Sequence, residues 1–134
     1  MTTAQKTRPA QYARPKYYDL NLAHLPLPGL LSIFHRISGV IPFFPLIPLG
    51  LYILQDCLGS PAGYLYWKSV FALTAVKVLL LGAVWLFAHH FFAGLRYLAL
   101  DVHIGIGKPA ANASARLVFA LGIIATALVA WRLW

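Results

Sequence analysis

Acidic residues are nearly missing from this chain. It has no glutamate, its 134 residues include three aspartates against eleven lysines and arginines, and charged residues make up only 10% of the whole. A soluble domain needs charge to cover its surface, so this composition, with 60% apolar residues, excludes an ordinary soluble protein. The bases stand at the ends of apolar segments and not in any soluble recognition element. We therefore predict no nucleic-acid partner and attribute the net charge of +8 to the basic bias of membrane-protein loops.

Cysteine is represented by a single residue, Cys57. One cysteine excludes an internal disulfide framework and any Cys-x-x-Cys site for zinc or an iron–sulfur cluster, so we interpret Cys57 as an inert small residue at a helix end. Residues 1–18 contain four bases but no acid and no apolar core, which is not the pattern of a secretory signal peptide. We predict a cytoplasmic tail over residues 1–29, with a transit peptide as the alternative.

Long apolar runs dominate the rest of the chain. The 19 residues 37–55 carry no formal charge, and at about 1.5 Å per residue they approach the roughly 30 Å thickness of a bilayer core. We predict an all-α membrane protein whose residues 30–134 form one domain of three transmembrane helices, at about 30–55, 67–100 and 114–134. The first of these contains Pro42, Pro45 and Pro48, which predict a bent helix. A turn is predicted over residues 56–66 and a break over residues 103–113.

The distribution of bases predicts the orientation in the membrane. Most of them precede or open the first span or flank the second connection, whereas Lys68 and Arg132 alone clearly mark the opposite boundary. Because cytoplasmic loops carry the excess of lysine and arginine, the N-terminus should be cytoplasmic and the C-terminus outside.

A polar stripe lies at the start of the first predicted span. Four residues at positions i, i+3, i+4 and i+7 share one helical face there: Ser32, His35, Arg36 and Gly39. A hydroxyl, an imidazole and a guanidinium at the membrane boundary could bind a quinone carbonyl or the carboxylates of a haem. The alternative is that Arg36 merely anchors the helix among lipid headgroups.

His90 is an ionisable residue inside the second predicted span, too deep to snorkel easily. It lies six residues, or roughly 9 Å, inward from Arg96, and an imidazole at that depth needs a partner. An iron atom would also explain Gly94 at i+4, where the missing side chain leaves room for a flat macrocycle. The alternative is a hydrogen bond from the imidazole to a backbone carbonyl of a neighbouring helix.

His89 and His35 are the other histidines near this depth. His89 points about 100° away from His90, so we expect it to face lipid, another chain or water and to be structural. His35 lies at the boundary, and the third span has no histidine. If the iron of a haem has two histidine ligands, the second must therefore come from another chain, so that the three helices form part of a multi-subunit bundle.

Three motifs together resemble a known family. They are Arg14-Pro15 with Asp19-Leu20, the string Ser32-Ile33-Phe34-His35-Arg36-Ile37-Ser38-Gly39, and the string His90-Phe91-Phe92-Ala93-Gly94-Leu95-Arg96 with Asp101. In these residues, over most of its length, the chain resembles the larger cytochrome b membrane-anchor subunit of bacterial and mitochondrial succinate dehydrogenases, the succinate:quinone oxidoreductases of respiratory complex II. The Ser-x-x-His-Arg-x-Ser-Gly string is the most specific of the three.

The resemblance implies a role for each site residue. His90 would be the axial ligand to haem b, with His35 and Arg36 near the propionates and Gly94 beside the macrocycle. Ser32 and Arg36 would line the ubiquinone pocket. Many relatives have a histidine directly after the arginine of the third motif, whereas this chain has Tyr97, which puts any role of that imidazole in doubt.

The resemblance also implies partners and a location. A smaller anchor subunit, which shares the haem, an iron–sulfur subunit and a flavoprotein subunit would accompany the chain in the bacterial inner membrane, or alternatively in the mitochondrial one. The chain would pass electrons to ubiquinone and would have no independent activity. The alternative is a haem-free structural anchor of a related complex. A transporter would need paired acids or broken helices at mid-membrane, where neither Asp56 nor Asp101 is placed.

Overall fold

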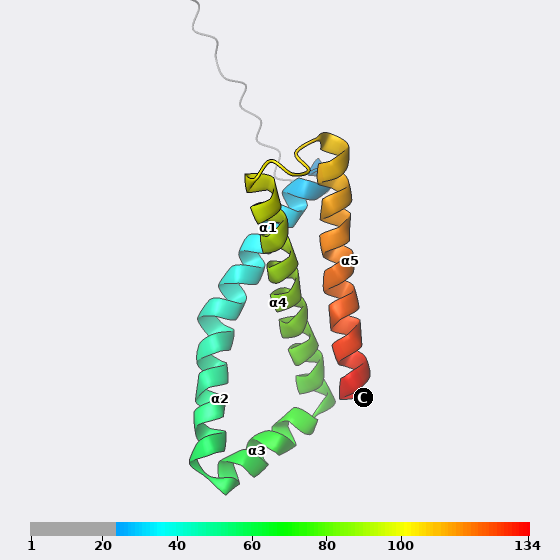
Figure 1. Cartoon of the computed structure of the whole chain (residues 1–134). Coiled ribbons are helices and arrows are strands. Elements are labelled where there is room, and N and C mark those ends of the chain that lie inside the picture. The colour runs from blue at the N-terminus through cyan, green and yellow to red at the C-terminus, as the bar shows by residue number, and fades with distance from the viewer. Residues whose placement is uncertain (1–23) are drawn as a thin grey trace, which may run out of the picture.

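The computed structural model describes residues 24–134, so the N-terminal motif and most of the predicted tail 1–29 lie outside the described residues. Within this range the chain is helical, with short connections (Figure 1). The elements in chain order are α1 (Leu27–Ile41), the π-helix η2 (Pro42–Leu46), α2 (Ile47–Gly59), α3 (Pro61–Ala72), α4 (Thr74–Asp101) and α5 (Lys108–Leu133).

Three helical segments are long and apolar enough to cross a membrane. They are Leu27–Gly59, Thr74–Asp101 and Lys108–Leu133, which confirms the predicted all-α fold with three transmembrane helices. The third begins six residues earlier than the expected 114. The sequence interpretation took Gly107 and Pro109 as breakers, but Gly107 is the extended residue before the helix and Pro109 lies in its first turn. Proline is tolerated there because the first amides of a helix have no partner within it.

The second predicted helix, 67–100, is interrupted, and the predicted turn 56–66 is almost entirely helical. Ser60 is the one residue between α2 and α3, and its Oγ accepts a hydrogen bond of 3.0 Å from the amide of Gly63. A serine followed by proline at the first helical position is a strong start signal, so the helix begins at Pro61. Leu73 is extended and separates α3 from α4.

The three prolines of the first span bend it, as predicted. Figure 1 shows the chain changing direction between α1 and α2. Pro45 lies inside η2 and has no amide to donate, and the amide of Ile47 bonds instead to the carbonyl of Pro42, five residues back. The wider turn absorbs the missing hydrogen bond and sends α2 away from α4.

The core lies where α1, α4 and α5 meet (Figure 1). It consists of Leu31, Ala93, Ala115 and Val118, with larger side chains packed around it. Alanines in α4 and α5 let the two backbones approach closely, which is how membrane helices associate without a hydrophobic driving force. Most large apolar side chains, such as Phe87 and Leu79, are exposed and require an apolar surrounding.

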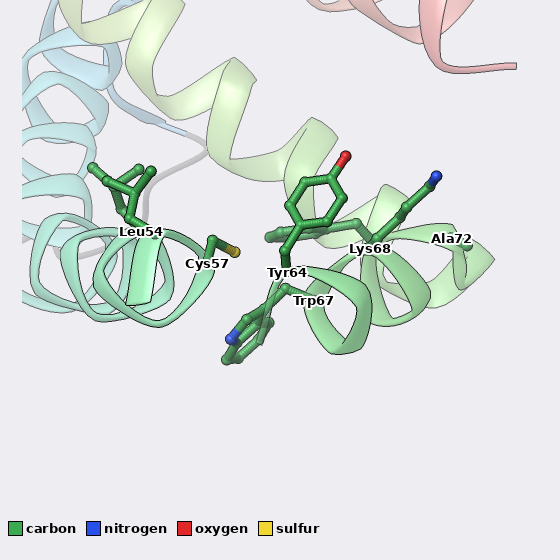
Figure 2. A pocket seen from close by; sticks show the side chains of 8 residues that line it. Leu54, Cys57, Tyr64, Trp67, Lys68 and Ala72 are labelled. Carbon is green, nitrogen blue, oxygen red and sulfur yellow. The ribbon is translucent and has the colours of Figure 1, made fainter. Parts of the chain in front are cut away.

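The corner between α2 and α3 is held by a hydrogen bond of 2.8 Å from Trp67 Nε1 to Asp56 Oδ2. A side chain at Gly63 would collide with the carbonyl of Asp56, so the two helices touch at their backbones. Figure 2 shows the hollow beside this corner, which has a volume of about 590 Å³ and is lined by Cys57 and Lys68, among others. The sequence placed Cys57 at a helix end, and it lies in the last turn of α2.

Candidate functional site

The polar residues of the two long motifs meet where α1 crosses α4. The imidazole rings of His35 and His90 are stacked, with centroids 4.4 Å apart and an interplanar angle of 15°. Tyr97 lies about two turns after His90 on α4, and its ring centroid is 5.0 Å from that of His35. Residues 55 positions apart in the sequence thus form one cluster.

The hydrogen bond of His90 determines which of its nitrogens is free. Its Nδ1 lies 3.1 Å from the backbone oxygen of His35. Because a carbonyl oxygen can only accept, Nδ1 must carry the proton and donate it, and Nε2 is left with a lone pair. A backbone carbonyl of a neighbouring helix is the alternative partner predicted for His90, and the carbonyl of His35 is that partner. The hydrogen bond leaves Nε2 of His90 able to bind a metal, and most metal-binding histidines are held in this way.

His90 borders a crevice of about 370 Å³ between the first span and α4. The crevice is lined by Ser38, Gly39, Pro42, Phe43, Leu46, Ile47, Ala83, Phe87 and His90. A Cβ atom at Gly39 would lie 2.8 Å from Cε1 of His90, so the imidazole occupies the space that this glycine leaves. The sequence placed Gly39 on the polar stripe but gave no sign that it contacts His90.

Nε2 of His35 is buried and has no hydrogen-bond partner among residues 24–134. A buried polar atom without a partner is unfavourable, so this atom suits an acceptor supplied by a bound group, such as a carboxylate. A Cβ atom at Gly94 would meet only this atom, at 3.9 Å. A methyl group at position 94 would therefore be in ordinary contact with His35, and the two histidines fit a group that offers a metal and carboxylates.

Ser32 and Arg36 lie one turn apart on α1 at the same end of the bundle. Ser32 is half-buried, whereas Arg36 is exposed. Of the predicted site residues, the structure brings His35, His90 and Gly94 together and leaves Arg36 on the surface of the chain. Among the described residues nothing pairs with its guanidinium, so the charge remains available to a group from outside.

His89 corrects the sequence interpretation, because it does not face lipid, another chain or water. It is fully buried, and its ring lies between those of Trp85 and Phe119, with centroids 5.2 and 5.0 Å away. The reason is that α5 packs on this face of α4, with Gly122 against the His89 backbone. Gly122, a small residue in the third predicted span, is the sequence feature that indicates the close approach of α5 to α4.

The chain matches the family model described as "Succinate dehydrogenase/Fumarate reductase transmembrane subunit" over residues 10–129. It belongs to this family. It is similar to the "Succinate dehydrogenase cytochrome b556 subunit" of Coxiella burnetii, with 33% identity over 126 residues, 90% of this chain and 97% of the relative. It is also similar to the subunit of the same name from Rickettsia felis, with 26% identity over 116 residues, 87% of this chain and 90% of the relative.

This transmembrane subunit of the succinate dehydrogenase and fumarate reductase family also contains a buried arginine that sequence reasoning treated as a boundary residue. Arg96 is only 9% exposed. Its Nε donates to Ser114 Oγ at 2.9 Å, and one terminal nitrogen donates to the backbone oxygen of Ala111 at 3.4 Å. Both acceptors lie near the start of α5, so Arg96 joins α4 to α5 beside the histidine cluster.

The substitution Arg96→Lys should lower the thermal stability of the purified complex that contains this transmembrane subunit. An ammonium on a shorter, unforked side chain would lose the bond to Ser114, and hydrogen bonds to charged groups contribute about 1.5–3 kcal/mol each. The measurement is thermal unfolding in detergent, with Arg116→Lys as the control because Arg116 lies exposed on α5. Equal melting temperatures for the two variants would contradict a stabilising role for the hydrogen bonds from Arg96 to α5.

Proposed function

We propose that this chain is the haem b-binding membrane anchor of a succinate:quinone oxidoreductase and that it passes electrons from an iron–sulfur subunit to ubiquinone. The observation that carries the proposal is the hydrogen bond of His90, which leaves Nε2 with a free lone pair beside a crevice within the membrane span. The curated relatives are named cytochrome b556 subunits, which supports a haem of type b.

Each residue of the cluster has a separate role in holding this cofactor. His90 would supply a nitrogen ligand to the iron, and the proton on its Nδ1 keeps the ring in the required tautomer. His35 and Arg36 supply donors for the propionates, since His35 Nε2 is buried without a partner in the part of the chain that the structure describes and Arg36 is exposed nearby. Gly94 lies beside His35 without a side chain. When bound, haem b supplies a one-electron carrier within the bilayer.

If the iron has two histidine ligands, the second would come from a partner chain. Among residues 24–134 no other imidazole is placed to bind the same metal as His90. His35 stacks on His90 itself, and His89 is enclosed between α4 and α5. His24 and His103 lie outside the membrane-spanning segments. The haem would therefore be shared with the smaller anchor subunit, and the isolated chain should not retain it.

Ser32 and Arg36 form this chain's part of the ubiquinone pocket. Arg36 is charged and exposed in the first half of the span Leu27–Gly59, and the half-buried Ser32 lies one helical turn before it. A guanidinium can stabilise negative charge as electrons reach a quinone oxygen, and a hydroxyl can donate a hydrogen bond to a quinone carbonyl. The smaller anchor subunit and the iron–sulfur subunit complete the pocket, and protons arrive from the aqueous side.

The complex also contains the flavoprotein subunit that oxidises succinate, and it lies in the bacterial inner membrane. Both curated relatives are bacterial, which supports that location over the mitochondrial inner membrane. The structure places the start of α1 and the connection between α4 and α5 at the same end (Figure 1). Their bases, Arg36, Arg96, Lys108 and Arg116, favour the cytoplasmic side for this end.

The test is to purify the complex through a tag on this chain. We expect a flavoprotein, an iron–sulfur protein and a second small membrane protein to accompany it, with succinate-dependent reduction of ubiquinone. A reduced-minus-oxidised absorption spectrum should show haem b. The same partners without haem bands would support the haem-free anchor instead, and the absence of these partners would overturn the proposal as a whole.

A further inference from the structure

We infer that Ser38 is a positioning residue that sets the redox potential of the haem through the backbone carbonyl of His35. The inference rests on the proposed function, because it requires that His90 ligate the iron. Ser38 belongs to the most specific motif of the sequence, yet neither the haem ligand set nor the quinone pocket uses it.

One carbonyl oxygen connects Ser38 to His90. The hydroxyl of Ser38 donates to the backbone oxygen of His35 at 3.0 Å, and Nδ1 of His90 donates to the same oxygen at 3.1 Å. Ser38 is fully buried, and it lines the same crevice as His90. The two side chains therefore share this oxygen with the helix.

Sharing weakens each of the two bonds. A carbonyl oxygen has two lone pairs, and in an α-helix the amide four residues further on takes one of them. The hydroxyl of Ser38 withdraws electron density from the oxygen that His90 uses as its acceptor. Without the hydroxyl, His35 would accept more strongly from Nδ1 of His90, and the proton there would be drawn further toward the oxygen.

The strength of that bond determines how basic the opposite nitrogen is. A stronger acceptor at Nδ1 makes the imidazole a better electron donor at Nε2, and a more basic ligand favours ferric over ferrous iron. By weakening the acceptor, Ser38 keeps the potential of the haem higher than the histidine alone would give. A higher potential favours electron transfer from the iron–sulfur subunit onto the haem.

Gly39 keeps the ring of His90 within reach of this carbonyl. A Cβ atom at position 39 would lie 2.8 Å from Cε1 of His90 and 3.2 Å from Nδ1, so even a methyl group would push the ring away from the His35 oxygen. The adjacent Ser38 and Gly39 thus act on the same histidine. One adjusts the strength of its hydrogen bond, and the other allows the bond to form.

A purely structural serine would have no such effect. A buried serine in a helix often satisfies its hydroxyl by donating to a carbonyl three or four residues back, without further consequence. Thr126 does this in α5, where its Oγ1 donates to the Gly122 carbonyl at 2.8 Å. That carbonyl has no histidine bonded to it among the described residues, so Thr126→Val is a matched control.

The test is a redox titration of the haem in the assembled complex. In Ser38→Ala the ratio of reduced to oxidised haem at fixed ambient potential should fall about threefold, which is a shift of about −28 mV at 59 mV per tenfold change. Ser38→Cys retains a weak donor and should give a smaller shift of the same sign. The control Thr126→Val should titrate as the unmodified complex does.

The outcomes separate this inference from the proposed function. An unmodified complex without haem would overturn the function of His90, whatever Ser38 does. A haem-containing Ser38→Ala complex with an unchanged or higher potential would overturn the inference and leave the function intact. Loss of haem from both Ser38 variants would also overturn it, because Ser38 would then be needed for folding and not for the potential.

Discussion

The substitution His90→Ala should remove haem b from the assembled complex. An alanine provides no nitrogen for the iron. Among residues 24–134, His35 is assigned to the propionates, His89 is enclosed between α4 and α5, and His24 and His103 lie outside the spans. The haem bands should therefore disappear from the reduced-minus-oxidised spectrum, measured on complex with unchanged subunit composition. Succinate oxidation by an artificial dye should continue, because that reaction does not pass through this chain.

The neighbouring histidine is the matched control. His89→Leu changes a residue of similar size directly beside His90, but one whose ring lies between Trp85 and Phe119, away from the crevice. The removed ring nitrogens have no hydrogen-bond partners among the described residues, so the substitution leaves no partner unsatisfied. We expect full haem bands. Haem retained in His90→Ala, or lost in His89→Leu alone, would contradict the assignment of the ligand.

The substitution Arg36→Ala should abolish most of the quinone reduction. The guanidinium is exposed and unpaired among the described residues, and it is placed to stabilise negative charge on the quinone. Removing one such donor lowers a rate by about 10²-fold in enzymes where it acts in the transition state. The measurement compares succinate-dependent ubiquinone reduction with dye reduction in the same preparation, and only the former should fall.

A second exposed arginine provides the control for Arg36. Arg116 lies exposed in the first half of α5, and α5 begins at the end of the bundle where α1 begins (Figure 1), so Arg116→Ala removes an equal charge. It should leave both reactions unchanged. Equal loss of both reactions in Arg36→Ala would indicate failed assembly. Unchanged quinone reduction would mean that Arg36 only anchors the helix among headgroups.

The number and approximate position of the spans followed from the sequence because they depend on local composition. Apolar runs of bilayer length have no other stable place, and the structure has three such helices. The boundaries were less predictable. Pro61 lies in the predicted turn 56–66 and Pro109 in the predicted break 103–113, whereas both lie in the first turn of a helix, directly after the capping residues Ser60 and Gly107 or one residue later.

The site was predictable as far as it consists of ionisable residues at membrane depth. His35 and His90 were selected because such groups are unfavourable in lipid without a partner, and Gly94 because it lies one turn after His90 without a side chain. The environment of His89 was not predictable in the same way. A helical wheel gives its direction relative to His90, but only the packing of α5 decides that this direction is the protein interior.

The sequence by itself determined that the chain has three segments able to span a membrane, and it predicted a functional site at His35 and His90. These conclusions follow from the free energy of transferring apolar and polar groups, which each residue carries with it. Only the tertiary structure decided that the carbonyl of His35 binds Nδ1 of His90 and that Gly39 makes room for the ring. Contacts between residues on different helices depend on where the helices cross, and the bend at η2 and the packing of α1, α4 and α5 set that crossing.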